Sequence, residues 1–150
     1  MSEDLEQIIF PLEVDDEGWP PFGAERMWAQ KVADGAYRID NSPFFAEGIA
    51  LDDIVTALTV REGELPQYGK TISHSGRISL SIIVLEASSE HEITAILEES
   101  DCWFEQGQPA KMVIYAVSVP SLSKYAPIKK FLSELEKSEK LSFTELCMPA

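Results

Sequence analysis

The sequence is poor in cysteine, histidine and basic residues. Its 150 residues include two cysteines and two histidines, and 12 lysines and arginines stand against 26 aspartates and glutamates. The formal net charge of -14 at pH 7 argues against nucleic acids and anionic membranes as partners, because both repel a strongly negative surface. A basic protein is the complementary partner.

The sequence also lacks a long hydrophobic run. No stretch approaches the roughly 20 apolar residues that cross a bilayer. The N-terminal sequence MSEDLEQIIF is acidic, whereas a secretory signal is basic and then apolar. We therefore expect a cytoplasmic protein. A chain of this length buries about 70% of the surface of its unfolded form, so its core needs no disulfide or metal.

Cysteine and histidine motifs are missing as well. Cys102 and Cys147 stand far apart without a C-x-x-C spacing, and each has apolar neighbours, which predicts reduced and buried thiols. His74 and His91 do not have the spacing of a zinc-binding helix. We therefore predict no metal site and no cofactor.

One group of residues contains the components of a hydrolase site. His74 and Ser75 could act with Asp52 or Asp53 as base, nucleophile and orienting acid. The glycine-flanked turn that exposes a serine nucleophile is absent, however, and adjacent side chains on a strand point to opposite faces. The pattern favours a polar strand end that leads into a glycine turn, and we expect no catalytic residue.

Residues 1–75 contain short strands separated by turns. Asp34-Gly35 is typical of a tight hairpin, because both central residues of that turn need a positive φ angle. Apolar and polar side chains alternate from Ile54 to Arg61, which is the period of a half-buried strand. The expected strands span residues 7–14, 25–33, 36–40, 54–60 and 67–74. This half is predicted to be a small curled antiparallel β-sheet or partial barrel.

Residues 76–150 alternate strands with helical patterns. Ser89-Glu90-His91-Glu92 has the form of a capping box, which predicts a helix start at Ser89. Pro127 is expected in the first turn of a second helix. The predicted strands span residues 78–86, 102–106, 111–119 and 141–147.

The order strand, helix, strand, strand, helix, strand predicts a ferredoxin-like βαββαβ unit. The expected fold class is therefore α+β. A β-rich subdomain, residues 1–75, is followed by a ferredoxin-like subdomain, residues 76–150, and the two pack as one compact unit.

The acidic residues concentrate in the first half. Residues 1–75 hold 5 basic and 15 acidic residues, a net charge of -10, and residues 76–150 hold 7 and 11, a net charge of -4. Three acids and Trp19 share the loop Asp15-Asp16-Glu17-Gly18-Trp19-Pro20-Pro21, whose spacing does not match a calcium loop. Interfaces are enriched in aromatic anchors ringed by polar groups, so this loop is the first candidate for partner binding.

The candidate partner-binding residues are Asp15, Asp16, Glu17, Trp19, Glu25, Asp52 and Asp53. Two of these assignments have simpler alternatives. For Trp19, burial against its own hairpin is favoured over partner binding, and for Asp52-Asp53 the favoured role is to cap a turn or short helix. Seven further aromatic residues are predicted to be core: Trp28, Phe44, Phe45, Trp103, Phe104, Tyr115 and Phe131.

Several short motifs of the chain are similar to those of a known family. They are Gly18-Trp19-Pro20-Pro21, Glu25 with Trp28-Ala29, Tyr37 to Phe45, Asp52-Asp53-Ile54-Val55 and Ser75-Gly76. With these motifs, spread over most of residues 10–86, the chain resembles a family of small bacterial proteins known as domain of unknown function 4265. The resemblance implies a bacterial origin and a shared fold. It carries no assigned activity and no catalytic residue.

Three functions are compatible with these observations. The first is a non-enzymatic binding protein, plausibly an immunity protein that covers the basic surface of a toxin, because small acidic α+β proteins recur in that class. The alternative is a small-molecule-binding or regulatory domain, since ferredoxin-like sheets often carry ligands on a free face. A hydrolase that uses His74, Ser75 or Cys102 ranks last.

Overall fold

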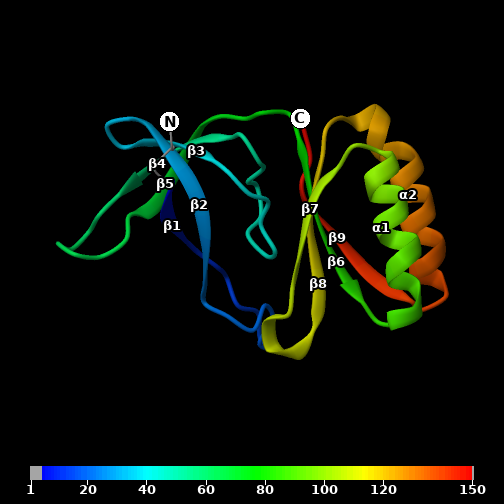
Figure 1. Cartoon of the computed structure of the whole chain (residues 1–150). Coiled ribbons are helices and arrows are strands. Elements are labelled where there is room, and N and C mark those ends of the chain that lie inside the picture. Colours follow the sequence, from blue (N-terminus) through cyan, green and yellow to red (C-terminus); the bar gives the residue numbers. More distant parts are fainter. Residues whose placement is uncertain (1–4, 150) are drawn as a thin grey trace.

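Two β-sheets lie side by side in the computed structural model, and two helices cover the outer face of the second sheet (Figure 1). The structure describes residues 5–149. The first sheet is a closed barrel in the order β1-β2-β3-β4-β5. Its strands are β1 (Leu5–Pro11), β2 (Ala24–Ala33), β3 (Ala36–Ile39), β4 (Ile54–Leu58) and β5 (Gln67–Ser73).

The barrel has an apolar interior because one side of each of the strands β1 to β4 is apolar. Ile8 and Phe10 of β1 point inward with Met27 and Ala29 of β2, and all four are buried. Gly35 has the positive φ angle that the tight β2–β3 turn requires, as predicted for Asp34-Gly35. The expected curled sheet closes completely, because β1 also pairs in parallel with β5.

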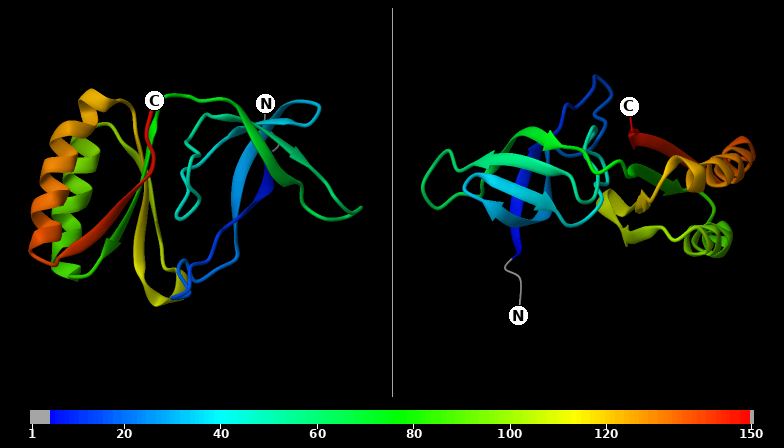
Figure 2. Two further views of the ribbon diagram at one scale, coloured as in Figure 1. Left: turned by 180° about the vertical axis from the view of Figure 1, so that it is seen from behind. Right: turned by 90° about the horizontal axis from the view of Figure 1, so that it is seen from above.

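The second sheet has the strand order β7-β8-β6-β9, and its neighbouring strands are antiparallel. Its strands are β6 (Ile78–Val84), β7 (Trp103–Gly107), β8 (Val113–Val119) and β9 (Leu141–Cys147). Helices α1 (Glu90–Glu99) and α2 (Leu122–Lys137) lie on the same face (Figure 2). This arrangement confirms the ferredoxin-like unit and the α+β fold class.

The central strand β6 is buried on both faces. Ile78, Leu80 and Ile82 join the core beneath the helices. The residues between them, Ser79 and Ser81, are also buried, but they face the barrel side. Small hydroxyl side chains on this face allow another part of the chain to approach the sheet closely.

The long β3–β4 connection, residues 40–53, is that part of the chain, and we call it the crossing loop. Ser42 Oγ donates a hydrogen bond to the Val117 carbonyl oxygen at 3.0 Å, and Ser79 Oγ donates to the Ile49 carbonyl oxygen at 2.6 Å. The Gly48 N–H donates to the Leu146 carbonyl oxygen at 2.8 Å. These contacts attach the barrel to the second sheet.

The first helix starts where it was predicted, with Ser89 as the N-cap residue of α1, but its capping hydrogen bonds and the predicted start of the second helix were wrong. Ser89 ends a short 3-10 turn, Ala87–Ser89, and its Oγ donates to the Glu86 carbonyl oxygen, so no capping box forms. Helix α2 begins at Leu122, where Ser121 accepts the Lys124 N–H, and Pro127 therefore lies inside the helix rather than in its first turn. No helix among the described residues, 5–149, is long and apolar enough to span a membrane.

Candidate functional site

A cleft of about 510 Å³ lies between the β1–β2 loop, the crossing loop and the barrel-side face of the second sheet. The β1–β2 loop, residues 12–23, projects from the barrel on the side of β9 (Figure 2). The cleft is lined by Pro11, Leu12, Glu13, Asp15, Trp19, Pro20, Phe44, Phe45, Glu47, Ser81, Ile83, Thr144 and Leu146. Residues from distant parts of the sequence therefore share one concave surface.

The acidic end of the β1–β2 loop is shaped by Asp15. Its Oδ1 accepts the N–H groups of Glu17 and Trp19, each at 2.9 Å. The Asp15 N–H in turn donates to the Trp19 carbonyl oxygen at 2.8 Å, and Gly18 provides the positive φ angle inside this turn. Asp15 therefore lines the cleft and also fixes the position of Trp19 beside it.

Three aromatic side chains, Trp19, Phe44 and Phe45, belong to the apolar part of the cleft wall. Trp19 meets Phe45 edge to face, with ring centroids 5.7 Å apart. The ring centroid of Phe22 lies 6.1 Å from that of Phe45. Trp19 keeps 42% of its surface exposed. The expectation that it is buried against its own hairpin was therefore wrong, and much of the indole is accessible from solvent.

The charged lining of the cleft has one sign. Glu13, Asp15 and Glu47 line it, and no lysine, arginine or histidine is among its lining residues. Glu13 and Glu47 are exposed. The cleft therefore combines accessible aromatic surface with a negative electrostatic potential, which favours a cationic ligand.

The other candidate residues lie in different surroundings. Asp16 and Glu17 are exposed on the β1–β2 loop but do not line the cleft. Asp52 has a left-handed backbone with a φ angle of 70°, and one of its oxygens lies 4.0 Å from Arg38 Nε. Asp53 has no exposed surface, so its carboxylate is not available to a protein partner.

Glu25 holds the crossing loop from inside the molecule. Its Oε2 accepts the Phe44 N–H at 2.7 Å, and its Oε1 accepts the N–H groups of Phe45 and Ala46 at 3.0 and 2.9 Å. Burial raises the pKa of Glu25, while these three hydrogen bonds act in the opposite direction. Glu25 thus positions Phe44 and Phe45, which line the cleft, but Glu25 does not line the cleft itself.

The predicted aromatic core is partly different from the observed one. Trp28 was expected inside but is 45% exposed, because Met27 and Ala29 take the two inward positions beside it on β2. Phe44 and Phe45 are half-buried and line the cleft. Sequence reasoning also missed Glu13 and Glu47 as residues of the cleft. Glu13 shares the β1–β2 loop with Trp19 but was assigned to the preceding strand, whereas only folding brings Glu47 to this loop.

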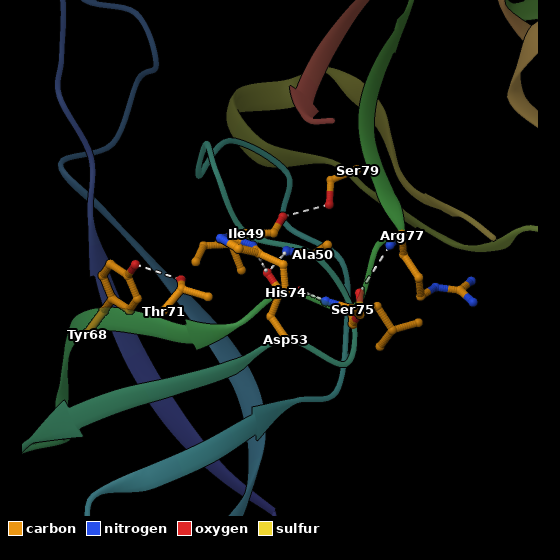
Figure 3. A network of polar contacts seen from close by, with 10 residues as sticks. Ile49, Ala50, Asp53, Tyr68, Thr71, His74, Ser75, Arg77 and Ser79 are labelled. Atoms are coloured by element: carbon orange, nitrogen blue, oxygen red, sulfur yellow. Dashed lines mark hydrogen bonds and ion pairs between the residues drawn. The ribbon is translucent and has the colours of Figure 1, made fainter. Parts of the chain in front are cut away.

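A second group of polar residues surrounds Asp53 (Figure 3). Its Oδ2 accepts the Ala50 N–H at 3.0 Å and its Oδ1 accepts the Ser75 N–H at 2.7 Å. His74 Nδ1 lies 3.3 Å from Oδ2. Ser75 Oγ donates to the Leu51 carbonyl oxygen, so this hydroxyl is held as a turn contact, and a serine–histidine pair of the hydrolase kind does not form.

Cys147 completes this group. Its Sγ, one His74 nitrogen and one Asp53 oxygen all lie within 4.8 Å of one another. Burial, followed by the charge of Asp53, raises the pKa of the Cys147 thiol. A thiol of this kind is a poor nucleophile, but these three residue types are able to hold a metal ion.

The other thiol has a separate environment. Burial raises the pKa of Cys102 to about 11, and its Sγ contacts the Ser100 carbonyl oxygen. Both cysteines are free. Cys102 was predicted to be buried, whereas it is half-buried; its raised pKa is that of an unreactive thiol.

Comparison with known proteins gives a family and a fold. A family model described as "Domain of unknown function (DUF4265)" matches residues 25–143. A solved structure described as "Novel crystal structure of a hypothetical protein from Neisseria gonorrhoeae" superposes with a TM-score of 0.78 at 24% sequence identity, covering 100% of this chain and 98% of that chain. None of the curated proteins compared with the chain matches it.

Proposed function

The chain belongs to the DUF4265 family, and we propose that it is a non-enzymatic protein-binding protein whose acidic aromatic cleft receives a basic segment of a protein partner. The observation that carries this proposal is the composition of the cleft. Three carboxylates line it together with Trp19, Phe44 and Phe45, and no basic side chain does.

Charge and aromatic surface have different roles in such binding. The net charge of -14 speeds the encounter with a cationic partner, and this steering weakens as salt screens it. Affinity comes mainly from a few anchors that become fully buried, most often aromatic residues and arginines. Trp19 and Phe45 offer the aromatic face on which an arginine or lysine of the partner would stack.

The more specific form of the proposal is an immunity protein that covers the basic active or substrate-binding surface of a bacterial toxin. It is supported by the acidity and small size of the chain and by analogy with such proteins, which is a weaker argument than a shared motif. The cytoplasm is the proposed location, and the two free cysteines agree with a reducing compartment.

Charge reversal in the cleft tests the proposal. The double variant Glu13→Lys/Glu47→Lys changes two exposed side chains that line the cleft. The control Glu62→Lys/Glu64→Lys makes the same change of charge in the exposed β4–β5 turn, which lies at the end of the barrel far from the second sheet (Figure 1). Circular dichroism establishes that both variants fold.

The tagged proteins are used to capture partners from a lysate of the source organism at low and high salt. We expect one stoichiometric partner, retained at high salt by the wild type and the control and lost by the cleft variant. Calorimetry with that purified partner should show affinity reduced by about 100-fold in the cleft variant, the loss of one or two hot-spot contacts. Equal capture by all three proteins, or capture of no stoichiometric partner, would overturn the proposal.

A small cationic molecule is the second candidate ligand, because the cleft volume of about 510 Å³ falls in the usual range for small-molecule sites. A thermal-shift measurement with an aliphatic polyamine distinguishes a small cationic ligand from a protein partner. A rise in melting temperature of the wild type and the control, but not of the cleft variant, would assign the cleft to a small molecule and contradict the protein-partner proposal.

A further inference from the structure

Three different metal-binding side chains meet where the barrel joins the second sheet. Asp53 lies at the end of the crossing loop, His74 directly follows β5, and Cys147 is the last residue of β9. Their ligand atoms all lie within 4.8 Å of one another. The crossing loop and β5 belong to the barrel, whereas β9 belongs to the other sheet, so the group exists only in the folded chain.

The distance within this group matches metal coordination. Zinc binds nitrogen and oxygen at about 2.0–2.1 Å, so two such ligands of one tetrahedral ion lie about 3.3–3.4 Å apart. Asp53 Oδ2 and His74 Nδ1 are 3.3 Å apart. A thiolate at about 2.3 Å from the ion lies about 3.6 Å from each of these atoms. Because Cys147 Sγ lies within 4.8 Å of the other two ligand atoms, a movement of up to about 1.3 Å brings it to this coordination distance.

The electrostatic environment also favours a cation. Asp53 is completely buried, and a buried carboxylate is costly unless it is compensated. In the described part of the chain no lysine or arginine forms an ion pair with it, and its contacts are two backbone N–H groups and His74. Those two N–H groups orient the carboxylate, as hydrogen bonds to metal ligands commonly do.

The set of donors indicates which ion would bind. A thiolate, an imidazole and a carboxylate together suit Zn²⁺ and related divalent transition ions better than Mg²⁺ or Ca²⁺, which prefer oxygen alone. The side chain of His74 is 63% exposed, so the fourth position of a tetrahedron can face water. A site with three protein ligands and one open position is a known arrangement for zinc.

We propose that Asp53, His74 and Cys147 form a binding site for one divalent transition-metal ion, with Zn²⁺ as the expected occupant. Binding forms metal–sulfur, metal–nitrogen and metal–oxygen bonds and releases the thiol proton of Cys147 to solvent. The ion would link the barrel to β9 and so join the two sheets. This inference does not depend on the function proposed for the cleft.

Titration of the full-length protein with Zn²⁺ tests the site, and the sequence supplies its own controls. The chain has two cysteines and two histidines, so Cys147→Ser is matched by Cys102→Ser, and His74→Ala is matched by His91→Ala. Each protein is freed of metal with a chelator and titrated against a competing chromophoric chelator. Asp53→Asn is avoided as the main test because loss of its buried hydrogen bonds affects folding.

We expect the wild type, Cys102→Ser and His91→Ala to bind one Zn²⁺ per chain with equal affinity. Loss of one ligand should cost at least the 10- to 100-fold that is typical of removing a supporting contact, so Cys147→Ser and His74→Ala should bind at least about 10-fold more weakly. Co²⁺ in the same site should show a thiolate-to-metal charge-transfer band that Cys147→Ser lacks.

Two results would overturn the proposal. One is a wild-type protein that binds no stoichiometric Zn²⁺, and the other is Cys147→Ser with the affinity and Co²⁺ spectrum of the wild type. Thiol alkylation provides an independent readout. Zn²⁺ should slow the reaction of Cys147 and leave that of Cys102 unchanged, and equal rates with and without Zn²⁺ would contradict coordination by Cys147.

Discussion

At the scale of single residues, Glu25 shows how burial and hydrogen bonding compete. Burial raises the pKa of its carboxyl even though three backbone N–H groups donate to it. A raised pKa means that the folded state binds the proton more readily than the unfolded state. The contribution of Glu25 to stability is therefore fully present below its unfolded pKa and is lost as the pH rises through the folded value.

We expect the free energy of unfolding of the wild type to increase relative to Glu25→Gln as the pH falls from neutral through the ordinary glutamate range, because the variant cannot titrate there. Urea unfolding of both proteins over this pH range measures the difference. A difference that shrinks as the pH falls would mean that the three hydrogen bonds outweigh burial.

At the scale of elements, the close approach of β4 and β5 at one position requires a glycine. An added Cβ at Gly69 would lie 2.6 Å from Thr56 Oγ1 on the facing strand. This hydroxyl accepts the Lys70 N–H at 3.0 Å, and threonine has few alternative rotamers. The β4–β5 pair therefore has no room for a side chain at this position.

We expect Gly69→Ala to destabilise the protein by about 1–3 kcal/mol, the usual cost of forcing an extra methyl group into a packed site. The control is Gly23→Ala, where an added Cβ meets nothing within 4 Å and the φ angle is not positive. Thermal unfolding of both variants checks the prediction. Equal melting temperatures for the two variants would show that β4 and β5 adjust without cost.

At the scale of the whole molecule, the crossing loop joins the two sheets. The Ser42 and Ser79 hydroxyls donate buried hydrogen bonds across this junction. Alanine at Ser79 leaves the buried Ile49 carbonyl oxygen without its hydroxyl donor, and alanine at Ser42 removes one of the hydrogen bonds to the buried Val117 carbonyl oxygen. Each change is expected to cost about 1 kcal/mol or more. The two bonds lie on the same short loop, so their energies are expected to be coupled.

We expect Ser42→Ala and Ser79→Ala each to lower the free energy of unfolding by about 1–3 kcal/mol, and the double variant to depart from additivity. Urea unfolding followed by circular dichroism and by tryptophan fluorescence measures both effects. Ser88→Ala, at an exposed hydroxyl that bonds only to Glu86, is the control and should change stability little. Strict additivity would show that the crossing loop does not act as one unit.

Much of the architecture could be predicted from local sequence. The hairpin at Asp34-Gly35 and the βαββαβ order formed as expected, because turn chemistry and apolar periodicity are local properties. Where tertiary contacts compete with local rules, the prediction failed. Ser89 is the N-cap residue of α1 as predicted, but its hydroxyl bonds to the Glu86 carbonyl oxygen and forms no capping box. Trp28 lies outside because the barrel core accommodates Met27 and Ala29.

The candidate sites were less predictable than the fold. The acidic loop with Asp15 and Trp19 was recognisable, since its residues are adjacent in sequence. The opposite cleft wall comes from the crossing loop and β9, and no local pattern connects Glu47 or Thr144 with that loop. For the same reason the sequence did not reveal Asp53, His74 and Cys147 as one group, because they lie on three separate segments of the chain. A spacing motif finds ligands on one element only.

The sequence by itself determined the strands, the helices and the excess of negative charge, because periodicity, turn residues and composition act over short distances. Only the tertiary structure decided how the barrel meets the second sheet. That junction depends on small serine side chains and on a loop whose backbone groups bond to distant strands. Both the cleft and the Asp53–His74–Cys147 group lie there, because concave surfaces and convergent polar groups form where separately folded elements pack together.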